Sequence, residues 1–168
     1  MEKYNIYKQQ TKQIVLKKSG EYIVNLLGTG AHANILGGFH ISGNDKLDID
    51  VRIIHTAKST SANTFIRAVV EDSSSANISG KIIVKKGAQQ TNSFLRENVL
   101  LVGQNAKATA VPDLEIEADE VKCSHAATVG KIDEEQLFYL MSRGINKAKA
   151  QQLIIDGFLE PVNQLINN

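Results

Sequence analysis

The chain has 168 residues, of which 42% are hydrophobic and 22% charged, the composition of one soluble domain with room for a substantial core. The 19 basic residues oppose 18 acidic ones, so the sequence lacks the basic field of a nucleic-acid-binding protein. No apolar run reaches the ~18 residues of a membrane span, and Cys123 is the only cysteine. We therefore expect a cytoplasmic protein that binds neither nucleic acid nor membrane and has no internal disulfide.

Residues 1–21 are expected to form an N-terminal extension or a first strand, and residues 22–130 to form a β core. The core region contains many short β segments separated by Gly, Asn, Asp and Ser, and it has no sustained helical period. The clearest segments are residues 22–27, 47–55, 64–70, 81–84 and 114–118.

Small residues precede the strand-like segments at a nearly constant spacing. They are Ala62, Ala76, Thr91, Ala106 and Val121. Such a period, here about 15 residues, is typical of stacked repeats, because each segment is too short to bury its own apolar face. With two segments per turn, the spacing predicts a right-handed β-helix or β-solenoid over residues 22–130. A β-sandwich, whose strands also recur at short intervals, is the alternative.

One glycine-rich segment imitates a dinucleotide-binding loop. Residues 28–33 read GTGAHA and follow a strand-like segment, but that function requires a helix directly after the loop. Gly37, Gly38 and Gly43 come too soon for such a helix, so we expect these glycines to turn a corner of the solenoid.

Two further groups of polar residues have simple structural explanations. Asp113, Glu115 and Glu117 alternate with apolar residues, which predicts an outward acidic stripe on an exposed strand. Paired carboxylates could instead serve a polysaccharide-acting enzyme. The isolated histidines are expected to be surface or hydrogen-bonded residues rather than metal ligands; they are His32, His40 and His55.

Cys123 and His125 form the most informative pair in the chain. They are next-but-one neighbours, so in a strand both side chains point to the same face. A thiolate and an imidazole suit iron, zinc or copper better than magnesium or calcium. Two ligands do not complete a zinc or iron–sulfur site, and a second surface would have to supply the rest. Packing of a small thiol and a hydrogen-bonded imidazole is the alternative.

Residues 131–168 change to a helical pattern. Asp133 and Gln136 resemble an N-cap and its reciprocal partner, and Gly144 is a typical helix stop. Asn146 is expected to cap a second helix. Its apolar stripe should pack in part against the end of the solenoid and leave a partner surface exposed.

The sequence VKCSHAATVGKIDEEQLFYLMSRGI, residues 121–145, resembles the C-terminal signature of the SufB/SufD family of iron–sulfur cluster assembly scaffolds. Residues 110–116 (AVPDLEI) resemble a second element of that family, and looser similarity extends over residues 22–160. Cys-Ser-His, rather than Glu-His-Glu, favours the SufD branch. Family members are usually more than twice as long, so we expect a short member or a fragment.

The resemblance implies a β-helix that pairs with a SufB-like or identical subunit and binds a SufC-type ABC ATPase. It implies a scaffold rather than an enzyme, with no stably bound cofactor and a transient iron–sulfur cluster or iron at the subunit interface. His125 and then Cys123 are the candidates for cluster assembly. The residues implied in ATPase binding are Gln136, Leu137, Phe138, Tyr139, Arg143, Gly144 and Ile145. The alternatives are a solenoid that acts on or binds carbohydrate and a purely structural interaction module.

Overall fold

The computed structural model describes residues 1–167, which form ten β-strands followed by two α-helices. In chain order they are β1 (Glu2–Ile6), β2 (Thr11–Leu16), β3 (Gly20–Leu26), β4 (His32–Ile41), β5 (Lys46–His55), β6 (Ser61–Glu71), β7 (Ser75–Val84), β8 (Thr91–Val102), β9 (Lys107–Ile116), β10 (Val121–Lys131), α1 (Glu134–Ser142) and α2 (Lys147–Asn167). The prediction of a mainly β chain with C-terminal helices is confirmed.

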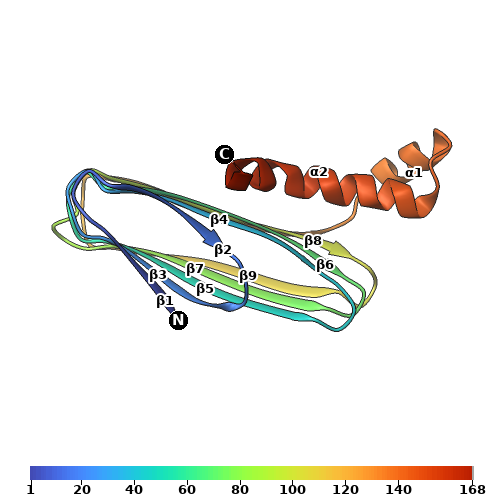
Figure 1. Cartoon of the computed structure of the whole chain (residues 1–168), viewed down its shortest axis with the longest axis horizontal. Helices are drawn as coiled ribbons and strands as arrows, with labels where there is room; N and C mark the ends of the chain where they lie inside the picture. Colours follow the sequence, from blue (N-terminus) through green and yellow to red (C-terminus); the bar gives the residue numbers. More distant parts are fainter. Residues whose placement is uncertain (168) are drawn as a thin grey trace.

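The strands coil into a flattened β-solenoid with two strands per turn (Figure 1). Odd-numbered strands form one parallel sheet, sheet A, in the order β1-β3-β5-β7-β9, and even-numbered strands form sheet B, in the order β2-β4-β6-β8-β10. Val24 pairs with Ile53, and Ile53 pairs with Ile82, so one full turn is about twice the predicted spacing between segments. The predicted solenoid is confirmed. Its right-handed sense stays a prediction, based on the general preference of parallel crossovers.

Alternation along each strand builds the core between the two sheets. In β5, Ile49, Val51 and Ile53 are buried, whereas the residues between them face outward. Because successive turns are in register, identical faces stack, and Val24, Ile53 and Ile82 form one fully buried row. Full burial of each such side chain stabilises the fold by roughly 1.5–3 kcal/mol.

The solenoid includes the start of the chain as well as the region after residue 22. Residues 1–21 contain β1, β2 and the beginning of β3, and Ile6, Ile14 and Leu16 are buried in the core. Tyr4 pairs with Val24, whereas Val24 pairs with Ile53, so the first turn is markedly shorter than the second. The shorter step interrupts the regular spacing, which is why the sequence pattern did not include this turn.

Both helices begin, and α1 ends, where their capping residues predict. Asp133 Oδ1 accepts hydrogen bonds from two backbone amides of the first turn of α1, at 2.9 and 3.2 Å. Gly144, at φ +86°, follows the C-cap of α1 in the left-handed region that favours glycine. Asn146 Oδ1 then accepts from a backbone amide of α2 at 2.9 Å.

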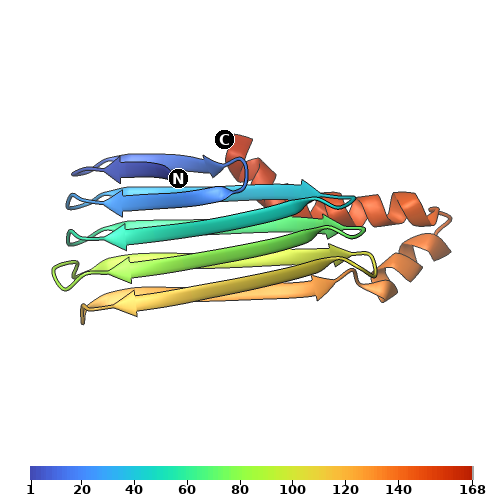
Figure 2. The same cartoon turned by 90° about the horizontal axis from the view of Figure 1, so that it is seen from below.

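The second helix lies across the outer face of sheet B, which corrects the expectation that it would pack against the end of the solenoid (Figures 1 and 2). Ile155 is buried against Val69, Leu100 and Val102 on that face. Further along the helix Val162 packs against Gly38, where a Cβ would approach the Val162 side chain to 3.2 Å. Val162, which belongs to the predicted stripe, is buried, but Ala150 and Ile155, which the prediction did not include, are buried as well, and the stripe meets the flank of the solenoid.

Arg67 fastens the helix to sheet B. Its guanidinium lies 4.9 Å from the ring centroids of both Phe65, on its own strand, and Phe158, on α2. It also donates a hydrogen bond to the backbone carbonyl of Phe158. Burial, together with the nearby charge of Arg96, lowers the pKa of Arg67. Two aromatic faces and a carbonyl therefore hold this cation between strand and helix.

Candidate functional site

The C-terminal end of the solenoid leaves the interior of its last turn partly open. In the described chain β9 and β10 are the last strands of their sheets, and each is paired on one side only. Figure 2 shows them at the edge of the stack, opposite β1 and β2. We call the inward-facing side chains of this turn the mouth. They are Ala108, Ala110, Pro112 and Leu114 on β9, and Val121, Cys123, His125, Ala127 and Val129 on β10.

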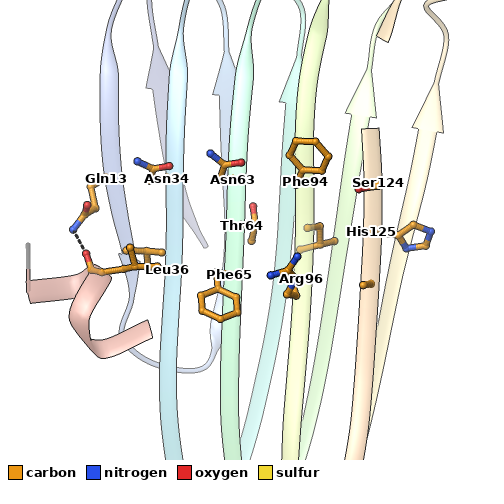
Figure 3. Close-up of a pocket in the computed structure, with 13 residues that line it drawn as sticks. Gln13, Asn34, Leu36, Asn63, Thr64, Phe65, Phe94, Arg96, Ser124 and His125 are labelled. Atoms are coloured by element: carbon orange, nitrogen blue, oxygen red, sulfur yellow. Dashed lines mark hydrogen bonds between the residues drawn. The ribbon is translucent and has the colours of Figure 1, made fainter. Parts of the chain in front are cut away.

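The structure brings Cys123 and His125 together in the mouth. β10 is a strand, and these residues are in register with Ser93 and Leu95, both of which are buried inside the solenoid. Cys123 is half-buried and packs against the core, so burial raises the pKa of its thiol. His125 is exposed. In Figure 3 its ring lies beside β10, at the opposite end of the labelled row from Gln13.

Glu97 lies one strand deeper and was not singled out in the sequence. It is 0% exposed, and neither carboxylate oxygen has a hydrogen-bond partner. Burial raises its pKa to about 7. It is in register with Ala127 of the mouth, and its Oε1 occupies space that a Cβ on Gly80 would need. The alternation of Ser93, Leu95, Glu97 and Val99 along one strand face is the sequence signal that could have identified it.

A second buried ionisable group, His55, is fully partnered. Its Nδ1 lies 2.8 Å from Thr60 Oγ1, and its Nε2 lies 3.0 Å from Ser93 Oγ. Burial lowers the pKa of the imidazole to about 4, so it is neutral at physiological pH. Because Ser93 is in register with Cys123, this hydrogen-bonded group directly underlies the thiol of the mouth.

The remaining histidines of the β region have hydrogen-bond partners, as expected. His32 contacts Ser61 Oγ at 2.7 Å, and His40 Nε2 lies 2.8 Å from Glu71. The glycine-rich segment 28–33 spans the turn between β3 and β4 and the start of β4, so it has no helix to hold a dinucleotide.

The predicted acidic stripe lies on the outer face of β9 and at the residue that follows it, Glu117, and it is paired with lysines. Lys81 contacts Asp113 and Glu115 at 3.1 and 3.0 Å, and Lys85 contacts Glu115 and Glu117 at 3.3 and 2.7 Å. Hydrogen bonds from these lysines hold the pKa of all three carboxyls below the ordinary range. None of the three is thus prepared to act as a general acid near neutral pH.

The segment predicted to bind the ATPase forms α1 and the turn after it. α1 has no buried residue, and it projects beyond the solenoid next to the end of β10 (Figure 2). Phe138 and Tyr139 are 73% and 57% exposed. Arg143 stacks on Tyr139, with 5.2 Å from the guanidinium carbon to the ring centroid. Gln136, Leu137, Gly144 and Ile145 belong to the same helix and turn.

A groove of about 480 Å³ runs along the outer face of sheet B beside the end of α2 (Figure 3). Outward-facing side chains of successive strands line most of it, its apolar members include Leu36, Phe65 and Phe94, and its lining reaches His125 on β10. Gln13 closes one end, where its side-chain amide donates to the backbone carbonyl of Leu165 at 3.2 Å.

Within residues 1–167 no three His, Cys, Asp or Glu side chains are arranged to hold one metal ion. The mouth therefore offers an incomplete set of ligands. Over the same residues no helix is both long and apolar enough to cross a membrane.

A family model for the SufBD core domain, of the SUF system for FeS cluster assembly, matches residues 11–158. The chain belongs to the SufBD family. The match begins at the first residue of β2 and includes the whole mouth and α1, so the functional candidates of this SufBD chain lie within the shared core domain.

Three curated relatives are described as iron–sulfur cluster assembly proteins. The iron–sulfur cluster assembly protein SufD of Escherichia coli is 39% identical over 125 residues, covering 74% of this chain and 30% of the relative. SufD of Bacillus subtilis is 36% identical over 142 residues, covering 84% of this chain and 32% of the relative. An iron–sulfur cluster assembly SufBD family protein of Pyrococcus horikoshii is 42% identical over 96 residues, or 57% of this chain and 21% of the relative. The chain thus spans about a third of the length of the two SufD relatives.

Proposed function

We propose that this chain is a SufD-like scaffold subunit in iron–sulfur cluster assembly. The observation that carries the proposal is the open mouth, in which Cys123 and His125 share the inward face of β10 at the uncovered edge of the solenoid. Thiolate and imidazole are ligands for iron, and their incomplete set is suited to a second surface that adds the others. Iron or a nascent cluster is thus cargo at an interface rather than a resident cofactor.

The second surface is a SufB-like subunit or another copy of this chain. The mouth presents small and apolar side chains, and the outer edges of β9 and β10 carry backbone groups that a neighbouring strand can pair. A second solenoid that docks there would cover the exposed interior and bring its own side chains to His125.

A SufC-type ABC ATPase is the proposed partner of α1. Exposed aromatic side chains next to an arginine are typical of interface hot spots, and Phe138, Tyr139 and Arg143 form such a group. The chain has no phosphate-binding loop of the Walker type, so ATP hydrolysis is assigned to the partner and this subunit acts as a scaffold.

The carbohydrate alternative has less support. Its candidate carboxylates, on the outer face of β9, are committed to ion pairs with Lys81 and Lys85. A glycosidase needs one carboxyl with a raised pKa, and these have lowered ones.

The test is anaerobic reconstitution of the chain with its SufB-like and ATPase partners, followed by the sulfur-to-iron absorbance band. His125→Ala is expected to leave folding and ATPase association unchanged and to abolish cluster formation. Cys123→Ser is expected to give a smaller defect. His40→Ala, which removes an exposed imidazole on the outer face, is the matched control. Cluster formation by His125→Ala at the wild-type rate and yield would show that the proposed site is wrong and that this chain is only a scaffold.

A further inference from the structure

Glu97 is a buried carboxylate without a partner. Its side chain is enclosed by the solenoid, and both oxygens lack a hydrogen-bond donor. The carboxylate lies beside the side chain of Leu95 and against the backbone of Gly80, which carries no side chain. Buried polar groups are almost always paired, and those left unpaired in a native structure commonly mark a functional site or the place of an absent ion.

The position of Glu97 relates it to the mouth. It faces the interior from β8 and is in register with Ala127, while His125 is in register with Leu95, the preceding inward-facing residue of β8. His125 therefore lies one strand away from Glu97 and one inward-facing position earlier. This places the Cα atoms of Glu97 and His125 about 8 Å apart, on the same face of sheet B. On this face of sheet B, Ala127 of β10, a small and exposed residue, lies between Glu97 and the open edge of the sheet.

A third group adds to the polar character of this spot. Thr64, on β6, is in register with Leu95, and its buried hydroxyl oxygen has no partner either. Glu97 therefore has His125 diagonally on one side and Thr64 diagonally on the other. Carboxylate and hydroxyl oxygens and imidazole nitrogens are the kinds of ligand that a divalent transition metal ion accepts.

We propose that Glu97 and His125 together bind a divalent metal ion, so that this subunit receives ferrous iron within its own last turn. A change in the side-chain torsions of both residues brings the carboxylate from Gly80 towards β10, and the His125 ring from the far side of β10 towards β8 (Figure 3), and water or the partner subunit supplies the remaining ligands. The identity of the ion as iron rests on the proposed function, whereas the pairing of Glu97 with His125 rests on the register of β8 and β10. Glu97 thereby extends the mouth from a surface site into the interior.

The test is titration of the full chain with Co²⁺ under anaerobic conditions, by calorimetry and by the visible absorbance of the bound ion. The wild type is expected to bind one equivalent. Glu97→Gln and His125→Ala are each expected to weaken binding at least tenfold and to alter the absorbance. Glu120→Gln removes the same charge from the exposed turn before β10 and serves as the control. A thermal melt of each variant distinguishes loss of the site from loss of the fold.

Two results would overturn this proposal: no Co²⁺ binding by the wild type, or wild-type affinity in folded Glu97→Gln. Both leave the proposed function standing if His125→Ala still abolishes cluster assembly in the complex. Conversely, normal cluster assembly by His125→Ala refutes the role of His125 in the proposed function, even where Co²⁺ binding depends on Glu97.

Discussion

Glu97 and His55 are two ionisable side chains inside one solenoid, and their environments differ in one respect. His55 has a hydrogen-bond partner at each ring nitrogen, whereas Glu97 has none at either oxygen. Desolvation favours the neutral form of both, which lowers the pKa of His55 to about 4 and raises that of Glu97 to about 7. The two groups therefore give stability opposite dependences on pH.

In the unfolded chain Glu97 has the ordinary carboxyl pKa of 4.5 and loses its proton above that pH. In the folded state the carboxyl keeps its proton up to a pH of about 7. Folding stability should thus fall as the pH rises from about 4.5 to about 7, by about 3 kcal/mol in all. Glu97→Gln is expected to remove this loss and to retain that of His55, which appears as the pH falls from 6.5 towards 4. Urea unfolding at pH 5 and pH 8 measures the difference.

The comparison uses the change in stability between the two pH values, since a buried glutamine is itself imperfectly paired. Glu120→Gln, at an exposed position, should retain the wild-type change. Equal changes in the wild type and in Glu97→Gln would mean that water reaches this carboxylate and solvates its charge.

The pairing of Cys123 and His125 in the mouth could be predicted from the sequence, whereas the unpaired state of Glu97 behind it could not. Cys123 and His125 share a face through strand parity alone, which needs only their spacing in the sequence. Glu97 also follows from parity, but its lack of a partner does not. That property depends on Gly80, Thr64 and Ala127, which are distant from Glu97 in the sequence and come close only through stacking of the turns.

At the scale of single elements, the exposed surface of α1 gives a second prediction. Phe138→Ala and Tyr139→Ala are expected to weaken binding of the ABC ATPase by about 2 kcal/mol, roughly thirtyfold. Their effect on unfolding free energy should stay within about 0.5 kcal/mol, because both side chains are largely exposed. Lys86→Ala is the control, because Lys86 lies in the exposed turn between β7 and β8, at the opposite end of the strands from α1. Lost stability with unchanged affinity would instead assign these residues to packing.

The attachment of α2 gives a third prediction. Arg67→Ala removes the cation between Phe65 and Phe158 together with a hydrogen bond to the helix backbone. We expect faster hydrogen exchange across α2, with the strands unaffected, because the solenoid core lies on the other face of sheet B. Arg96→Ala, on the same outer face, should leave exchange in α2 unchanged. Uniform acceleration in helix and strands would show that α2 and the solenoid open as one unit.

The capping residues of both helices were readable in advance because a cap is a local interaction. The surface that α2 covers was not, because an amphipathic pattern identifies the apolar face of a helix and leaves its partner undefined. Gly38 and Val69 on sheet B decide the outcome, and their outward position becomes clear only once the register of β4 and β6 is known.

For the whole molecule, the mouth is the predicted surface of association. Val129 and Val111 are both exposed valines, at 42% and 54%, but Val129 belongs to the mouth and Val111 to the outer face of sheet A. Val129→Asp is expected to abolish pairing with a second solenoid, since it places an unpaired charge in an apolar contact. Val111→Asp should leave pairing intact. Sedimentation of each variant, alone and mixed with the SufB-like partner, decides between them.

The mouth also sets the symmetry of any pair that forms through it. Two identical copies that meet mouth to mouth make an isologous contact, which is complete at two subunits and leaves no free half of the same interface. A twofold axis would then run between them, and each His125 and Glu97 would have an equivalent in the other copy. A pair of unlike solenoids removes that equivalence, so one side can bind the metal while the other delivers sulfur. Exchange of a single subunit would therefore change the chemistry of the shared site while the architecture of both solenoids stays the same.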